Sequence, residues 1–361
     1  MTKSIYYDYV KRFFPKLVVS VVEKLNEKRT NQLPYLYREM LEPEYSADGR
    51  WASVLGQYMR VAADVVALDT ELPLKSRDTI EVAHGDIPKM GMKCVLSEKQ
   101  ISDIDAMIAQ GKPMEQVMRA MFNDVRRVIE GIYERMEDMF LSGLSSGVAL
   151  SGNSTGTGVR LSYGFLKENQ FSCHLKKWSE DATTDAMGDL RRVFDKAEED
   201  QNVITDCYAD DAFLRALYKN NGVRAAYAFT LGYNGSAQAP VLGFDQLATV
   251  FMTQFGCTLH RVSRKVRTEL NGVQKKHSPW KSGIGIFTCD NVVGKMVYAD
   301  LAETNRPVEG VAYQAADEYI LASRYSLTDP LREITASQAR VVPIINNVDQ
   351  IYQFDSTQTN G

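Results

Sequence analysis

The chain has 361 residues, of which 44% are hydrophobic and 24% charged, and its formal net charge is -4 at pH 7. This length and composition are typical of a globular protein with two to three domains, or one elaborate domain, around a substantial core. Because positive and negative residues are interspersed, the sequence gives no reason to expect a clustered basic surface for tight nucleic-acid binding. The five cysteines form no C-x-x-C pair, which favours reduced thiols over a disulfide scaffold.

The first 50 residues are mixed in character. Residues 17–22 form an apolar run that stops at Glu23 and is too short for a signal peptide or a membrane span. Tyrosines and basic residues surround this run, a pattern typical of an extended arm that carries one amphipathic helix. We expect the arm to need a partner before it becomes ordered.

Short alternating runs between residues 67 and 95 predict a long two-stranded excursion, with turn signals at Pro73, Gly85 and Pro88. A two-stranded ribbon is only marginally stable by itself in water. We therefore expect it to rest on its own domain or on a neighbouring subunit.

The strongest pattern in the chain predicts one long amphipathic helix from Pro113 to Gly143, about 40 Å in length. Its apolar stripe repeats at three- and four-residue steps and consists of Met118, Met121, Val125, Val128, Ile132, Met136 and Met139. The opposite face is charged and consists of Arg119, Asp124, Arg126, Arg127, Glu130, Glu134, Glu137 and Asp138. Proline is tolerated in a first turn, and Gly143 is expected to supply the left-handed stop. Such a helix is expected to act as a strut.

Helices and strands alternate after this helix. Residues 147–163 predict a hairpin with a glycine-rich turn. A second amphipathic helix follows, capped by Thr183 or Thr184, with an apolar face of Met187, Leu190, Val193, Phe194 and Ala197. A buried strand is expected at residues 203–208 and a further helix at 210–218.

The last third of the chain has mainly strand signals. Asn271-Gly272 joins the run 258–266 to a run that starts at Gln274, and this dipeptide is the strongest short-range hairpin signal. Further strands are expected at residues 284–289 and 295–298. Residues 341–354 predict a last strand in a sheet, followed by a short disordered polar end.

No motif builds a convincing active site. Residues 143–147 match the G-x-S-x-G pattern of a hydrolase with Ser145 as nucleophile, but that pattern needs a strand before the turn and a helix after it. Here the order is reversed, which favours a helix stop leading into a hairpin. The glycine-rich residues 152–158 lack the lysine of a phosphate loop, and Cys257 with His260 lacks the further ligands that a structural zinc needs. We expect no catalytic residue, no cofactor and no metal.

Several short segments, taken in chain order, resemble a known family. They are Gly85-Asp86-Ile87-Pro88-Lys89, Leu96-Ser97-Glu98, Leu141-Ser142-Gly143, residues 159–164, Lys177-Trp178-Ser179, Asp329-Pro330-Leu331-Arg332-Glu333 and the strand through residues 351–354. Together they span nearly the whole chain. They resemble the major capsid proteins of tailed bacteriophages, in the lambda-type major capsid protein E family with the Hong Kong 97 (HK97) fold.

The resemblance implies an α+β fold of the HK97 type, with an N-terminal arm, an extended loop (E-loop), a peripheral domain (P-domain) and an axial domain (A-domain). The arm and the start of the P-domain are expected at residues 1–61, the E-loop at 62–97, the P-domain at 98–199 with its spine helix at 113–142, and the A-domain at 200–312. Residues 313–361 are expected to return to the P-domain and to end in the C-terminal strand.

The resemblance also implies a structural protein, not an enzyme: the major capsid protein of a phage head. Such a protein self-assembles in the host bacterial cytoplasm into pentamers and hexamers of an icosahedral shell. The shell encloses double-stranded DNA without sequence-specific binding and contacts no membrane. A portal and a decoration protein are implied as partners. Only about 60 residues precede the loop, too few for a large fused scaffolding segment, so a separate scaffolding protein is expected.

The expected assembly contacts are four charged residues at the tip of the ribbon, Lys75, Arg77, Asp78 and Glu81, because such charges can meet opposite charges on a neighbour. A fully solvated tip is the alternative for these residues. Three other functions stay open. An encapsulin-type nanocompartment would differ in particle size and nucleic-acid content, a tail or adaptor protein would form rings or tubes, and a hydrolase would depend on Ser145.

Overall fold

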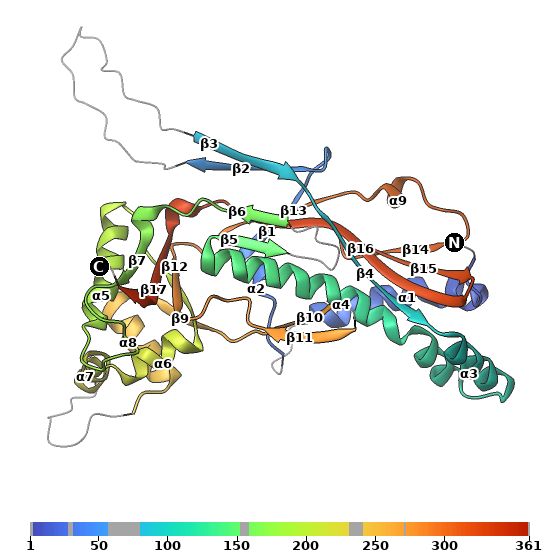
Figure 1. Cartoon of the computed structure of the whole chain (residues 1–361), viewed down its shortest axis with the longest axis horizontal. Helices are drawn as coiled ribbons and strands as arrows, with labels where there is room; N and C mark the ends of the chain where they lie inside the picture. The colour runs from blue at the N-terminus through green and yellow to red at the C-terminus, as the bar shows by residue number, and fades with distance from the viewer. Residues whose placement is uncertain are drawn as a thin grey trace, which may run out of the picture.

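The computed structural model describes residues 3–27, 32–56, 80–151, 159–230, 241–270 and 272–359. The molecule is elongated, and its long axis carries two hydrophobic cores (Figure 1). The larger core lies between a six-stranded sheet and the long helix, and the smaller core lies at the end of the molecule that holds the C-terminus.

The larger sheet has the strand order β1-β13-β16-β15-β14, with β4 paired to β16 as well. Its strands are β1 (Leu41–Tyr45), β4 (Lys89–Leu96), β13 (Gly294–Ala299), β14 (Ala312–Ala316), β15 (Ile320–Thr328) and β16 (Leu331–Ile345). The long strand β16 organises this sheet, because it pairs antiparallel with β15, β4 and β13 along different parts of its length. The strand predicted at residues 295–298 is β13.

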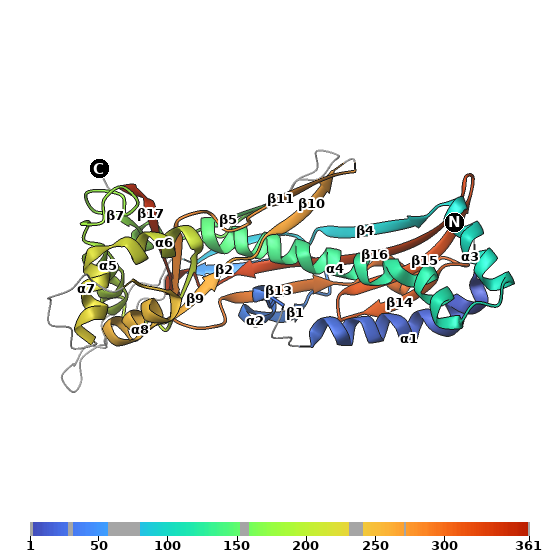
Figure 2. The same cartoon turned by 90° about the horizontal axis from the view of Figure 1, so that it is seen from below.

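The predicted long helix is confirmed as α4 (Met114–Ser146), which lies across the larger sheet and packs on β16 and β4 (Figure 2). Its 33 residues correspond to about 50 Å. The predicted apolar stripe is buried, except that Met118 is only half-buried. The predicted stop at Gly143 is wrong: the helix continues to Ser146, and Gly147, with φ of +74°, is the left-handed residue that ends it.

The N-terminal helix α1 (Tyr7–Asn26) packs against α4 and β14 of its own chain. Val10, Phe14 and Val18 are completely buried, and the ring of Phe14 lies 6.4 Å from that of Phe122. The helix was predicted, but the expectation that this segment needs a partner is wrong for α1. Two shorter helices, α2 (Leu36–Met40) and α3 (Glu98–Ala109), also pack on α4.

The smaller core surrounds a five-stranded sheet of order β7-β17-β12-β8-β9. Its strands are β7 (Gln170–Cys173), β8 (Asp206–Asp210), β9 (Thr258–Val262), β12 (Ile284–Thr288) and β17 (Ile351–Thr359). Helices α5 (Ala186–Glu199), α6 (Asp211–Lys219), α7 (Asn221–Thr230) and α8 (Phe244–Phe255) gather around this sheet (Figure 1). The predicted cap of α5 is wrong, because Asp185 and not a threonine accepts the hydrogen bond from the N–H of Gly188.

Three antiparallel pairs stand apart from both sheets: β2 (Arg50–Gly56) with β3 (Ile80–Asp86), β5 (Val148–Ser151) with β6 (Val159–Ser162), and β10 (Val266–Leu270) with β11 (Val273–His277). The second and third are the two predicted hairpins, although β9 is a separate strand and not part of the third. The first pair differs from the prediction in extent. It begins at Arg50, before the expected residue 67, and β4 joins the larger sheet instead of continuing the ribbon.

The C-terminal region contains two strands where one was predicted. The residues after 340 first complete β16 in the larger sheet, and a short 3-10 turn at Val348–Gln350 then leads into β17 in the smaller sheet. The expected disordered polar end is wrong for Asp355 to Thr359, since these residues belong to β17. The short helix α9 (Ala302–Asn305) lies between β13 and β14.

Candidate assembly surfaces

The ribbon β2–β3 pairs residue by residue from Arg50 opposite Asp86 to Gly56 opposite Ile80. Neither strand pairs with any other strand in the described part of the chain. At its base, the indole of Trp51 covers Gly85 so closely that a Cβ there would lie 2.9 Å from Nε1, and Ile87 N–H donates to Gly49 O at 2.9 Å. These contacts hold the two strands together at the base of the ribbon, and Nη2 of Arg340 in β16 joins that base to the body by donating to Gly49 O at 3.2 Å.

The four predicted contact residues cannot be placed by this structure. Lys75, Arg77 and Asp78 lie outside the described residues. Glu81 lies in β3 opposite Leu55, and its side chain is also outside the described part. Their role in assembly stays a prediction.

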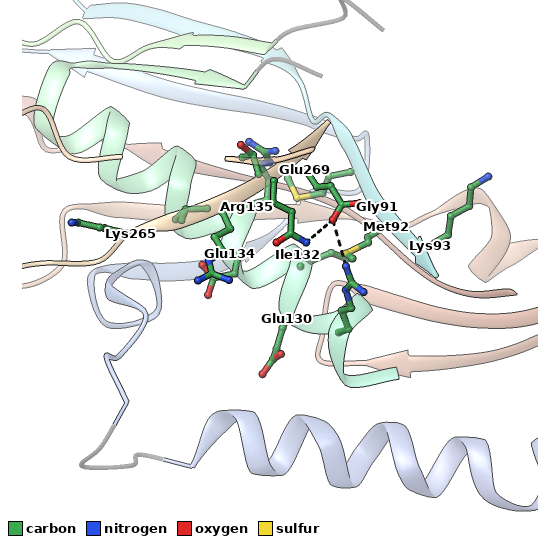
Figure 3. A pocket seen from close by; sticks show the side chains of 16 residues that line it. Gly91, Met92, Lys93, Glu130, Ile132, Glu134, Arg135, Lys265 and Glu269 are labelled. Carbon is green, nitrogen blue, oxygen red and sulfur yellow. Dashed lines mark hydrogen bonds and ion pairs between the residues drawn. The ribbon is translucent and has the colours of Figure 1, made fainter. Parts of the chain in front are cut away.

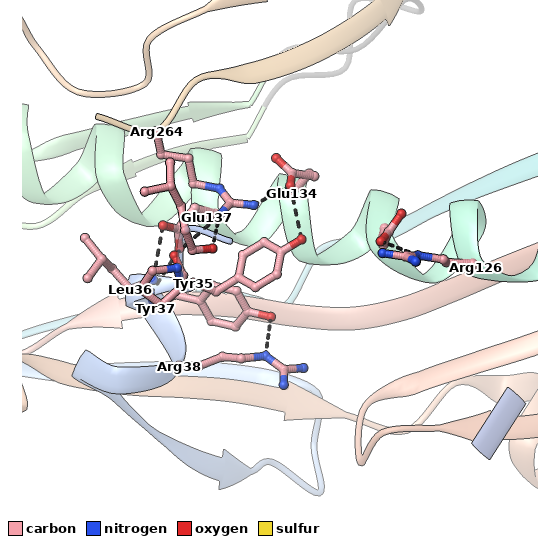
Figure 4. A network of polar contacts seen from close by, with 11 residues as sticks. Tyr35, Leu36, Tyr37, Arg38, Arg126, Glu134, Glu137 and Arg264 are labelled. Atoms are coloured by element: carbon pink, nitrogen blue, oxygen red, sulfur yellow. Dashed lines mark hydrogen bonds and ion pairs between the residues drawn. The ribbon is translucent and has the colours of Figure 1, made fainter. Parts of the chain in front are cut away.

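A polar network joins α4 to two distant segments (Figure 4). The carboxylate of Glu137 is completely buried and accepts backbone N–H groups from Leu36 and Tyr37, each at 3.1 Å. One turn earlier on the helix, Glu134 accepts the hydroxyl of Tyr35 at 3.1 Å and forms an ion pair with Arg264. This network connects the start of α2 and the residue before it, the long helix, and the connection between β9 and β10.

Burial dominates the electrostatics of Glu137. It raises the pKa of this carboxyl from 4.5 to about 7, against the opposing effects of the Tyr37 and Leu36 N–H groups and of Arg264. The charge pattern of the helix predicted Glu137 and Asp138 on an exposed face, and that prediction is wrong. Both are buried because they have partners elsewhere in the chain.

The hairpin β10–β11 is fastened to α4 at two points. Nε2 of His277 lies 2.7 Å from Oδ1 of Asp138, and Nη2 of Arg127 lies 3.5 Å from Oε2 of Glu269. Between the hairpin, α4 and β4 there is a groove of about 880 Å³ (Figure 3). Its floor includes Gly131, where a Cβ would lie 2.5 Å from the sulfur of Met92. All of the nearest atoms around this position belong to the flexible side chain of Met92 on β4.

The Ser145 site does not have the geometry of a hydrolase nucleophile. The residue lies within α4, is completely buried, and donates its hydroxyl to Leu141 O at 2.8 Å while accepting the N–H of Lys281 at 2.9 Å. A nucleophile elbow instead exposes its serine on a turn between a strand and a helix. The hydroxyl of Ser145 thus joins the end of α4 to the segment before β12.

The described residues contain no group of three or more His, Cys, Asp and Glu side chains that could hold a metal ion. His260 is instead 2.7 Å from Asp206 and stacks on Tyr208, with ring centroids 4.6 Å apart. Of the helices in the described ranges, none combines the length and the hydropathy that a bilayer crossing requires.

Two solved phage proteins have a fold similar to this one. A prophage protein of E. coli CFT073 described as a capsid protein superimposes with a TM-score of 0.58 at 13% identity, over 94% of this chain and 98% of that one. A phage-related protein from Bordetella bronchiseptica RB50 superimposes with a TM-score of 0.51 at 9% identity, over 95% and 97% of the two chains. No curated protein sequence matches the chain.

These similarities define the fold as that of a phage capsid subunit of the HK97 type, as predicted. The sequence model of the family Phage major capsid protein E matches residues 57–355. The chain therefore belongs to the phage major capsid protein E family and is a capsid shell protein. This family is one of structural proteins.

Proposed function

We propose that the chain is the subunit from which the pentamers and hexamers of an icosahedral phage head are built, and that this head encloses double-stranded DNA. The observation that carries the proposal is the match to the capsid family over residues 57–355. The shape of the molecule supports it, because an elongated subunit with a projecting ribbon offers several faces to neighbours.

In this proposal the larger core and α4 form the P-domain, the smaller core forms the A-domain, and the ribbon β2–β3 belongs to the E-loop, which reaches a neighbouring subunit. The boundary between the domains is drawn before β7 instead of at residue 200. The reason is that α5 packs in the smaller core, where Leu190, Val193 and Ala197 are buried.

The proposal includes partners outside the chain. A separate scaffolding protein, a portal and a decoration protein complete the head, and assembly takes place in the host bacterial cytoplasm before the protein becomes part of the virion. In this proposal the chain has a structural role in the head and catalyses no reaction there.

Negative-stain electron microscopy tests the proposal. The purified chain is imaged alone and after co-expression with the proteins encoded beside it. Closed shells, or free pentamers and hexamers, are the expected result. Small closed particles without DNA would instead favour an encapsulin-type compartment, and rings or tubes a tail or adaptor protein. A monomer or dimer under both conditions would contradict the proposal.

A further inference from the structure

The hairpin β10–β11 is strongly basic in a chain that is acidic overall. Residues 264–277 contain five basic side chains and one acidic side chain, whereas the whole chain has a net charge of -4. Lys265, Arg267, Lys275 and Lys276 are all exposed. The hairpin also projects from the body, as Figure 2 shows. The structure thus places a clustered positive surface where the sequence, judged by overall charge, predicted none.

The acidic residues nearby do not neutralise this cluster. Each glutamate that lines the groove under the hairpin already has an arginine partner: Glu130 pairs with Arg126, Glu134 with Arg264, and Glu269 with Arg127. Arg267, Lys275 and Lys276 form no ion pair with any described residue, and neither does Lys93 on the opposite wall of the groove. The excess positive charge remains available to a partner.

The strand register concentrates this charge further. Arg267 lies directly opposite Lys276 in the antiparallel pair, and Lys275 is the next residue along. Like charges directly opposite each other destabilise a β-ribbon, so this register has a cost unless an anion lies between or above the two side chains.

The chemistry of the hairpin favours a polyanion over a protein surface. All five residues of β11 are exposed, and Val273 is the one apolar residue among them. Protein interfaces take most of their binding energy from buried aromatic or apolar anchors, which this strand lacks. A two-stranded ribbon that carries lysine and arginine can instead enter the major groove of DNA, which is about 12 Å wide, and neutralise phosphates there.

We propose that the hairpin β10–β11 contacts the phosphate backbone of the double-stranded DNA inside the shell, without reading its sequence. This inference rests on the proposed function, because it requires that the shell encloses DNA. Arg267, Lys275 and Lys276 provide the contacts, and Lys93 extends the positive surface across the groove. Glu269 and His277 hold the hairpin on α4 and keep these cations in place.

The test measures binding of the full-length chain to a short fluorescent DNA duplex by anisotropy, from about 50 to 200 mM salt. The variant R267Q/K275Q/K276Q removes three exposed cations. We expect its affinity at the lowest salt to fall roughly tenfold per lost contact, and the slope of log K against log salt to decrease by about 0.9 per contact. A thermal unfolding curve for each protein checks that the variants remain folded.

The matched control is K11Q/K99Q/K112Q, which removes the same charge from exposed positions on α1, on α3 and after α3. We expect this control to keep the wild-type slope. Equal losses in both triple variants would mean that only net charge matters and would overturn the proposal. A polyglutamate peptide of matched charge that binds as tightly as the duplex, and loses binding in the hairpin variant, would also overturn it by identifying an acidic protein segment as the partner.

Electron microscopy separates this inference from the proposed function. Both variants are expected to form the same shells as the wild type, because the proposal places the three hairpin cations on DNA and assigns none of the six substituted residues to a contact between subunits. If shells form and the duplex titrations of the hairpin variant and the wild type coincide, the DNA contact is wrong and the capsid function stands. If the wild type forms no shell or capsomer, the proposed function fails whatever the titrations give.

Discussion

Arg324 and Glu333 form an ion pair that is completely buried between the adjacent strands β15 and β16, with Nε of the arginine 2.9 Å from Oε1 of the glutamate. The same carboxylate accepts the hydroxyl of Ser4 and the N–H of Ile5. The guanidinium donates to Met121 O at 2.9 Å. This pair therefore fastens the N-terminal residues and the long helix to the larger sheet.

Removing one member of this pair is expected to be costly. R324M leaves the Glu333 carboxylate buried without a cation, and we expect it to lower the free energy of unfolding by about 3–5 kcal/mol. The double variant R324M/E333L should lose less than the sum of the two single variants, because both charges leave the core. Urea unfolding of the unassembled chain measures all three values.

The matched control for this cycle is R126Q. Arg126 and Glu130 form an exposed pair one turn apart on α4, at 2.7 Å. Such pairs contribute about 0.3–0.5 kcal/mol, so the control should be nearly neutral. An R324M variant as stable as R126Q would show that the buried pair is not needed to hold the N-terminal residues on the sheet.

Two glycines within α4 are predicted to differ in their tolerance of alanine. At Gly143 a Cβ would lie 2.4 Å from the ring of Tyr163, which is held by its hydroxyl donating to Pro343 O at 2.8 Å. G143A should therefore cost about 1–3 kcal/mol through overpacking, more than the gain in helix propensity of about 1 kcal/mol. At Gly131 the nearest atom belongs to the flexible side chain of Met92, so G131A should be close to neutral.

Thermal or urea unfolding of the two variants side by side checks this contrast. Both substitutions are alanine for glycine in one helix, so the change in helix propensity is the same and cancels in the comparison. If G143A were as stable as G131A, the ring of Tyr163 would be free to move. The close packing between the end of α4 and the segment after β6 would then not limit this position.

Local patterns predicted α4 better than its surroundings. The three- and four-residue spacing placed its buried stripe, since a helix of 3.6 residues per turn leaves little choice of face. Its end was placed too early because Gly143 and Gly147 both look like stops in the sequence. The positive φ of Gly147 and the contact of Gly143 with Tyr163, from another element, show that Gly147 ends the helix and that Gly143 lies within it.

The polar residues of α4 show what periodicity cannot predict. Glu137 and Asp138 follow the charged face of the helix, yet Tyr37 and His277, which contact them, are 100 and 139 residues away in the sequence. The basic surface of β10–β11 was missed for a related reason. Residues 264–277 hold five basic side chains and one acidic side chain, but the overall charge of the chain hides this local excess, and the hairpin register is needed to place Arg267 opposite Lys276.

The buried carboxyl of Glu137 predicts that stability falls as pH rises. Burial raises its folded pKa to about 7 from 4.5, so between these values the folded state binds more protons than the unfolded state. The free energy of unfolding then decreases with rising pH across this window, by about 3 kcal/mol in total. The contribution of Glu137 to stability is fully present below pH 4.5 and is lost as the pH rises through about 7. E137Q removes this titration and should give a flatter dependence on pH.

Urea unfolding at several pH values between 4.5 and 7 measures this effect as the difference between the wild type and E137Q. The control is E130Q, which changes a partly exposed glutamate on the same helix and should run parallel to the wild type. Parallel curves for the wild type and E137Q would mean that the two backbone N–H donors of Leu36 and Tyr37 keep the carboxylate ionised throughout.

The ribbon tip provides the last prediction. If Arg77 meets an acidic group on a neighbouring subunit, R77E replaces an attraction with a repulsion and should raise the concentration needed for assembly. A contact of about 1 kcal/mol per subunit corresponds to about a fivefold increase. Light scattering against protein concentration measures the concentration at which assembly begins.

R50E is the control, since Arg50 lies at the base of the ribbon and pairs with Asp86 of its own chain. A folded R77E that assembles at the wild-type concentration removes Arg77 from the proposed contacts, because a solvated charge at the tip would produce that result.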